Sequence, residues 1–264
     1  MLKYIVLAII VFLCYSFDLW LGIAATVLGI GYVVYMLLPN FMAAQGSKAF
    51  SEKDYEKALK FYKKAYDTGR ANMNIKNGYA VLLMRMGKFD DAETVLNEII
   101  LDRRLPREQK SAAKQYRTLL YFKQGKEEEA LEDAEELFET YRNTTMYGLL
   151  GYIKLATNQP MDETLQFCRD AYEYNADDRD IVDNLVLALY KSGAYEEAEE
   201  YAADLREDHP EFLEAFYHSA FIAKKLGDHG KAAEYAARIG SCNRTGLTTI
   251  SEAEVDALKK ELGM

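Results

Sequence analysis

Cysteine and histidine would be the first residues to consider for nucleophilic or metal chemistry, and both are scarce in this chain. There are three cysteines and three histidines. Cys14, Cys168 and Cys242 are far apart, odd in number, and never form a Cys-x-x-Cys pair. A disulfide framework or a zinc site is therefore not predicted.

The histidines and the acidic clusters also have simple structural interpretations. Residues 127–129, 132–136 and 196–200 are rich in Glu and Asp. These clusters are interpreted as solvated helix faces, with calcium or a basic partner as the alternative. The histidines are interpreted as surface or packing residues, and they are His209, His218 and His229.

Motifs for phosphate binding and hydrolysis are absent from the sequence. It contains no GxxxxGK[ST], GxGxxG, GxSxG or HExxH pattern. We therefore predict no catalytic residue, no metal and no cofactor, and we do not expect an enzyme. An unrecognised active site remains the alternative, and turnover by the isolated body of the chain would reveal it.

Charge is distributed unevenly along the 264 residues. The net charge is −10, yet from Met1 to Pro39 only Lys3 and Asp18 are charged. An apolar head is thus joined to an acidic body. Because a duplex-binding protein would be expected to show a basic stripe, nucleic acid is not a predicted partner.

The apolar head predicts a helical hairpin in a membrane. Residues 19–38 would form a helix of about 30 Å, which matches a bilayer core. Residues 4–17 would form a shorter one. Asp18 separates them, and a carboxylate is far less costly in an interfacial turn than at the bilayer centre. There Asp18 can cap the second helix, and Trp20 is an aromatic residue typical of the interface.

Basic residues near the hairpin suggest its orientation. Lys3 precedes the first helix, several lysines follow residue 47, and the turn has none. Both ends are therefore predicted to be cytoplasmic. The alternatives are a single span at residues 19–38 with the body outside the cytoplasm, a signal peptide, and a buried hairpin of a soluble protein.

A repeat dominates the acidic body. Similar segments begin at 53, 87, 125, 159, 193 and 227, as in GKFDDAETVLNEI (87–99) and GAYEEAEEYAADL (193–205). Most spacings are 34 residues, and one is 38. Small and apolar residues recur three and four apart within each segment, which predicts one packed helix face. A second amphipathic segment precedes each turn, so every unit is predicted to be two helices joined by a short turn.

This pattern resembles the tetratricopeptide repeat (TPR) family. The resemblance implies an all-α fold, a TPR α-solenoid of six helix-turn-helix repeats after a transmembrane hairpin. The predicted domains are a two-helix anchor (1–39), the solenoid (40–240), and a linker with a capping helix (241–264). Ser251 and Glu254 form a capping-box pattern at the start of that last helix. The predicted repeats lie near residues 40–70, 73–102, 109–141, 145–175, 179–208 and 212–240.

The resemblance also implies that the first helix of each repeat lines a concave groove. The register selects a largely apolar and aromatic row there. Four of its members are more simply explained as packing residues, namely Val81, Leu119, Ile153 and Leu187. Asn77 alone matches the family's clamp for a terminal carboxylate, so that ligand is not predicted. The hypothesis for the partner-binding groove comprises Asn77, Met84, Gln115, Phe122, Asp183, Tyr190, Tyr217, Phe221 and Lys224.

An adaptor is the function that these features favour. A groove of this composition would suit a helix or an extended segment of another protein. Two alternatives remain open: an extracytoplasmic protein of envelope assembly or secretion, and a non-catalytic subunit of a membrane enzyme. The partner's identity and the oligomeric state do not follow from the sequence.

Overall fold

The structure, a computed structural model, describes residues 2–264, and its secondary structure in that range is helical. It has 14 α-helices and one short 3-10 helix. Within the described residues there is no strand, only an isolated bridge between Phe212 and Asn243. The predicted all-α class is confirmed. The chain divides into two compact units, Met1–Leu82 and Leu83–Met264.

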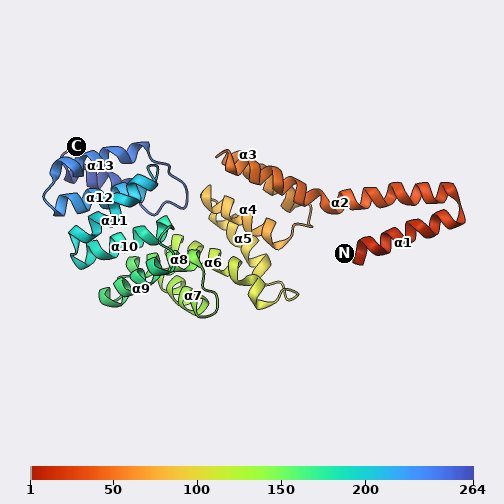
Figure 1. Cartoon of the computed structure of the whole chain (residues 1–264), viewed down its shortest axis with the longest axis horizontal. Coiled ribbons are helices and arrows are strands. Elements are labelled where there is room, and N and C mark those ends of the chain that lie inside the picture. The colour runs from red at the N-terminus through yellow and green to blue at the C-terminus, as the bar shows by residue number, and fades with distance from the viewer. Residues whose placement is uncertain (1) are drawn as a thin grey trace. The chain divides into compact units, whose positions relative to one another are not determined.

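The first unit begins with a helical hairpin (Figure 1). Helix α1 spans Leu2–Phe17 and α2 spans Leu19–Ser51. Asp18 is the N-cap of α2, and its carboxylate accepts hydrogen bonds from the amides of Trp20 and Leu21. The predicted cap is therefore present, and it satisfies two of the amides that a helix start leaves without partners.

Small residues of α2 allow the two hairpin helices to approach closely. A Cβ at Gly22 would lie 2.3 Å from the ring of Tyr15, and one at Gly29 would lie 3.6 Å from Leu7. Thr26 also donates a hydrogen bond to the Tyr15 hydroxyl across the hairpin, over 3.2 Å. Glycine is needed at position 22 because the Tyr15 ring occupies the space of a side chain.

Helix α2 continues without a break through Pro39 into the repeats. Its 33 residues correspond to about 50 Å. The later part of α2 packs on α3 (Tyr55–Asp67), where Ala49 and Ala58 are buried together. The division at residue 39 stays a prediction, and the same helix serves both sides of it.

The remaining helices follow the predicted alternation. Each repeat turn separates a first helix from a second, and the residues at the predicted alanine register are buried. Ala92, Ala130, Thr164, Ala198 and Ala232 are each exposed by 1% or less. The helices are α4 (Met73–Arg85), α5 (Phe89–Ile100), α6 (Arg107–Lys123), α7 (Glu127–Thr140), α8 (Thr144–Ala156), α9 (Met161–Tyr174), α10 (Arg179–Ser192), α11 (Tyr195–Asp208), α12 (Leu213–Lys225) and α13 (His229–Arg238).

The turns between paired helices require a left-handed residue. Gly193 ends α10 with a φ of 88°, a conformation that costs glycine little. The fourth turn has Gln159-Pro160 instead of the usual glycine, and there Asn158 takes a φ of 52°. Asparagine tolerates this region better than most residues, so the fourth turn keeps the repeat geometry.

The second unit ends in a capping helix. After the 3-10 helix Ile239–Ser241, a linker leads to α14 (Glu252–Glu261). The capping box is formed by Ser251 and Glu254, as the sequence predicts. Val255 and Leu258 are buried against α12 and α13 in a cluster with Leu213 and Ile239. This helix covers the apolar face that the last repeat would otherwise expose.

Candidate functional site

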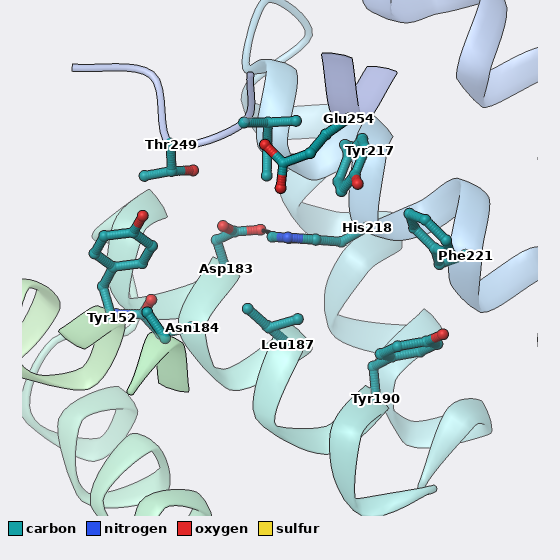
Figure 2. A pocket seen from close by; sticks show the side chains of 12 residues that line it. Tyr152, Asp183, Asn184, Leu187, Tyr190, Tyr217, His218, Phe221, Thr249 and Glu254 are labelled. Atoms are coloured by element: carbon teal, nitrogen blue, oxygen red, sulfur yellow. Dashed lines mark hydrogen bonds and ion pairs between the residues drawn. The ribbon is translucent and has the colours of Figure 1, made fainter. Parts of the chain in front are cut away.

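A cavity of about 300 Å³ lies in the second unit, where three first helices and the C-terminal segment converge (Figure 2). We call it the α8–α12 pocket. Its lining residues are Tyr152, Ala156, Asp183, Asn184, Leu187, Tyr190, Tyr217, His218, Phe221, Thr249, Ile250 and Glu254. It therefore combines aromatic side chains with two carboxylates and a histidine, a mixture that can anchor and orient a ligand.

Asp183 and His218 form a hydrogen-bonded pair in the wall of the pocket. Asp183 Oδ1 and His218 Nδ1 are 2.7 Å apart, and their residues are only 8% and 7% exposed. Burial acts to lower the pKa of the His218 ring, but the charge of Asp183 and this hydrogen bond prevail and raise it. A buried charge remains stable here because it has a charged partner.

The aromatic side chains on α10 and α12 form one continuous wall. The ring centres of Tyr217 and Phe221 are 5.1 Å apart in an edge-to-face arrangement, and those of Tyr190 and Phe221 are 6.3 Å apart. All three are half-buried. Because neighbouring rings hold them in place, they offer a preorganised apolar surface on one side of the pocket.

A second carboxylate, that of Glu254, lies beside Tyr217 in the lining of the pocket. Glu254 Oε2 accepts hydrogen bonds from the Ser251 amide and hydroxyl, at 2.7 and 2.6 Å. Figure 2 shows this carboxylate turned toward the interior of the pocket. Burial, Glu254 and Glu261 together raise the pKa of the Tyr217 hydroxyl to about 12. Burial, Glu214 and Glu254 likewise raise the pKa of Tyr152.

The linker between α13 and α14 crosses the surface of the first helices. The Gly246 amide donates to the Arg85 carbonyl over 2.8 Å, and Lys123 Nζ donates to the Thr248 carbonyl over 2.8 Å. A Cβ at Gly246 would lie 2.3 Å from the Met84 carbonyl oxygen. Part of the predicted groove is therefore covered by the chain itself, at α4 and α6.

The linker is also attached close to the pocket. Glu214, which is buried on α12, accepts hydrogen bonds from the Thr249 amide and hydroxyl, at 2.7 and 3.0 Å. The Asn243 amide donates to the Glu211 carbonyl over 3.1 Å. These contacts place Thr249 and Ile250 in the pocket wall.

The structure brings together four residues of the groove hypothesis. Asp183, Tyr190, Tyr217 and Phe221 all line the α8–α12 pocket, as does Leu187. They lie on two consecutive first helices, α10 and α12, which the repeat register predicts to be neighbours. The grouping of these residues follows from the 34-residue period.

The other groove residues lie elsewhere. Met84 and Gln115 are only 1% and 5% exposed, so their side chains offer almost no surface to a partner. Phe122 packs edge-to-face on Tyr152, with ring centres 5.0 Å apart. Lys224 forms an ion pair with Glu261 of α14.

Three further sequence-selected residues belong to the first unit. Asn77 is buried on α4, and its side-chain oxygen has no hydrogen-bond partner among the described residues. Asp18 and Trp20 lie at the start of α2, where Trp20 is 76% exposed.

Several pocket residues escaped the sequence-based selection. Tyr152, Asn184 and His218 lie on the predicted first helices but outside the register positions that were selected. His218 directly follows Tyr217, so a wider register window would have included it. Glu254 lies outside the repeats, and only the folded linker brings it to the pocket.

Metal ligation finds no support in the described part of the chain. No group of three or more His, Cys, Asp or Glu side chains is arranged there to hold a metal ion. Cys168 is buried, and burial raises its pKa to about 12, so it is a packing residue within the core of the repeats.

Two segments of the chain match tetratricopeptide repeat families, at residues 49–116 and residues 184–241. No curated protein matches. A solved tetratricopeptide repeat protein from Parabacteroides merdae ATCC 43184 is 14% identical, with a TM-score of 0.55 over 86% of this chain and 99% of that chain.

Two other solved structures are also similar to the chain. PilF from Pseudomonas aeruginosa is 15% identical, with a TM-score of 0.57 over 85% of this chain and 97% of that chain. A chain of the APC/C hetero-tetramer Cut9-Hcn1 is 12% identical, with a TM-score of 0.64 over 84% of this chain and 42% of that chain. At these identities the likeness shows the fold. The two repeat matches, the observed helix pairing and the buried small-residue register agree with it: this chain contains tetratricopeptide repeats and has the fold of tetratricopeptide repeat proteins.

Proposed function

We propose that this protein is a membrane-anchored adaptor that binds a segment of a partner protein in the α8–α12 pocket. A tetratricopeptide repeat scaffold is suited to protein–protein interaction. The observation that carries the proposal is the convergence of Tyr190, Tyr217 and Phe221, half-buried, on one cavity. Large aromatic side chains held in this way are typical anchors of binding energy at interfaces.

The proposed partner segment enters the part of the concave surface that the linker leaves open. The linker already covers α4 and α6 near Gly246 and Thr248. The cavity begins beyond Thr249 and is bounded by α8, α10 and α12. A short extended segment or one turn of a helix matches a cavity of about 300 Å³ better than a long helix does.

Capture from intact membranes tests the pocket directly. The variant that replaces Tyr190, Tyr217 and Phe221 with Ala should lose partner capture by at least about tenfold, because interface anchors of this kind are each worth more than 1 kcal/mol. Partners would be crosslinked in membranes, purified with the full chain and quantified by mass spectrometry. Circular dichroism would establish that the helical content is retained.

The matched control is Tyr174→Ala. Tyr174 is an exposed aromatic residue on α9 and does not line the pocket. This variant should capture the same partners as the unaltered chain. Equal capture by the folded triple variant would place the binding surface elsewhere and contradict the proposal.

The membrane part of the proposal rests on the first unit. One helix, α2, is long and apolar enough to cross a membrane by length and composition, and α1 is a shorter apolar helix. Phe17 and Trp20 at their junction are 86% and 76% exposed. We propose that both helices cross, that Asp18 caps the turn at the far interface, and that the repeats lie in the cytoplasm.

The continuity of α2 gives the anchor a mechanical consequence. Because the same helix enters the first repeat, that repeat is held close to the membrane surface without a flexible linker. Restricting an adaptor to a surface raises its effective concentration for partners on the same membrane. The proposed function is therefore to recruit or retain a partner at the membrane.

A reporter fused after Met264 tests the topology. A fluorescent reporter that matures only in the cytoplasm should be active, and a phosphatase that folds only outside it should be inactive. The opposite pair of results would mean that α2 alone crosses and that the repeats work outside the cytoplasm. Protease protection of the repeats in sealed vesicles of known orientation provides an independent reading.

A further inference from the structure

We propose that the α8–α12 pocket receives a lysine or arginine side chain of the bound segment. This inference rests on the proposed function and names the chemistry that its site selects. The pocket offers a cation both of the interactions that stabilise it away from bulk water. These are a carboxylate at contact distance and the face of an aromatic ring.

The charge of the pocket is the first part of the argument. Of its two lining carboxylates, Asp183 is already paired with His218. Glu254 binds only Ser251, through Oε2, and no hydrogen bond to Oε1 is found among the described residues. Glu254 is therefore the carboxylate that remains available to a ligand.

Among the described residues, no ion pair joins a lysine to Glu254, although the charges of Lys123 and Glu254 attract each other through space. Lys123 donates to the Thr248 carbonyl, and Lys191 donates to the Leu155 carbonyl over 2.7 Å. Lys224 pairs with Glu261. Glu254 is therefore a pocket carboxylate without an ion-pair partner in the described part of the chain. Burial, together with the charges of Glu254 and Glu261, raises the pKa of Tyr217 to about 12.

The aromatic wall supplies the second interaction. Tyr217 lies beside Glu254 in the lining of the pocket, and Phe221 and Tyr190 continue the aromatic wall away from it (Figure 2). A cation between this wall and Glu254 would meet π-electron density on one side and a carboxylate on the other. An acidic side chain would instead be repelled by Glu254, and an apolar one would gain no charge interaction with it.

The chain already uses this arrangement internally. The guanidinium of Arg206 lies 4.3 Å from the ring centre of Tyr235. The same group pairs with Glu199, at 2.8 and 3.3 Å. A cation held between a tyrosine face and a glutamate is therefore compatible with the side-chain spacing that this fold provides.

Peptides with a fixed central residue provide the test. The probes are pools of N-acetylated, C-amidated nonapeptides whose central residue is Lys, Arg, Gln, Leu or Glu and whose other positions are the same mixture of uncharged residues. Binding to the full chain in detergent micelles is measured by fluorescence anisotropy. The Lys and Arg pools should bind about threefold to tenfold more tightly than the Gln pool, and the Glu pool most weakly.

Glu254→Gln is the decisive variant, and Glu252→Gln is its control. Glutamine at position 254 can still accept the Ser251 hydrogen bonds, so the capping box and α14 are retained. Glu252 is exposed in the same first helical turn and does not line the pocket, so its replacement removes the same charge elsewhere. E254Q should abolish the preference for Lys and Arg over Gln, and E252Q should leave it intact.

The outcomes separate this inference from the proposed function. Equal binding of all pools would overturn the proposal that the pocket receives a Lys or Arg side chain. A preference for Lys and Arg that survives E254Q would overturn it too. In both cases partner capture from membranes can still depend on the aromatic wall. No binding by any pool also overturns the proposal of a Lys or Arg side chain. If the folded triple variant captures partners from membranes as well as the unaltered chain does, the proposed function itself is contradicted. A Lys and Arg preference that weakens with salt and requires Glu254 supports the inference.

Discussion

Asp183 on α10 and His218 on α12 are joined by a 2.7 Å hydrogen bond between Oδ1 and Nδ1. They lie 35 residues apart, in first helices of consecutive repeats. The bond therefore links two repeats through a charged pair in the wall of the α8–α12 pocket. A nearly buried ion pair of this kind makes stability depend on pH.

Stability should decrease as the pH rises through the pKa of His218. That pKa is raised above the ordinary histidine value of 6.5, because the effect of Asp183 exceeds that of burial. The folded state therefore retains a proton that the unfolded state loses. The stabilisation is complete below about pH 6.5 and is lost as the pH rises through the folded pKa, at about 1.4 kcal/mol for each unit of difference.

Denaturant unfolding at several pH values measures this effect. His218→Gln should remove the decrease, so the wild-type minus variant difference isolates the contribution of His218. Glu214, which also favours the charged ring, and Lys191, which opposes it, remain in both proteins. An identical pH profile for the two chains would contradict the assignment.

Thr164→Ala should stabilise the protein slightly. Thr164 occupies the alanine position of the fourth repeat, where its hydroxyl is buried without a hydrogen-bond partner among the described residues. Removing that group and improving helix propensity should add about 0.5–1 kcal/mol to the free energy of unfolding. The reciprocal change Ala198→Thr, at the equivalent buried position of the next repeat, should cost about 1–3 kcal/mol. Destabilisation by Thr164→Ala would show that the hydroxyl has a partner.

Gly246→Ala should release the linker from the first helices. The new Cβ would lie 2.3 Å from the Met84 carbonyl oxygen, and a backbone atom cannot move aside as a flexible side chain can. Faster hydrogen exchange is expected at the Gly246 and Thr248 amides. Gly240→Ala is the control, because a Cβ there meets nothing within 4 Å. Unchanged exchange in the Gly246 variant would mean that the linker can shift without losing its contacts.

Cys168 should resist alkylation until the protein unfolds. It is buried, and burial raises its pKa to about 12, so almost no thiolate is present near pH 8. Mass spectrometry after iodoacetamide treatment should find Cys168 unmodified in the folded chain and modified in denaturant. Modification at the same rate in both states would contradict its place in the core.

The pocket shows which kinds of neighbour a repeat sequence can predict. Asp183 and Tyr190 on α10 are grouped with Tyr217 and Phe221 on α12, as the register implies. Neighbouring first helices follow from the period because each repeat packs on the next in the same way. Asn184 and His218 line the same pocket, although each directly follows a residue that the register selects. The rotation of the helix about its axis decides whether such a neighbouring side chain also reaches the pocket.

Whether the side chain at a register position is exposed depended on long-range contacts that do not repeat every 34 residues. Met84 occupies the same register position as Tyr190, yet Met84 is 1% exposed and Tyr190 is half-buried. The linker that covers Met84 is held by a bond between Lys123 and the Thr248 carbonyl, 125 residues apart in the chain. Nothing in the repeat register indicates such a contact.

The sequence by itself determined the all-helical class, the repeat period, the buried small-residue positions and the two helix caps at Asp18 and Ser251. These features depend on residues three to four apart and on turns within one repeat, so local chemistry specifies them. Tertiary structure decided which part of the concave surface stays open and that Glu254 joins it. The physical reason is that an aperiodic linker is placed by individual long-range hydrogen bonds, which form only once the repeats have packed.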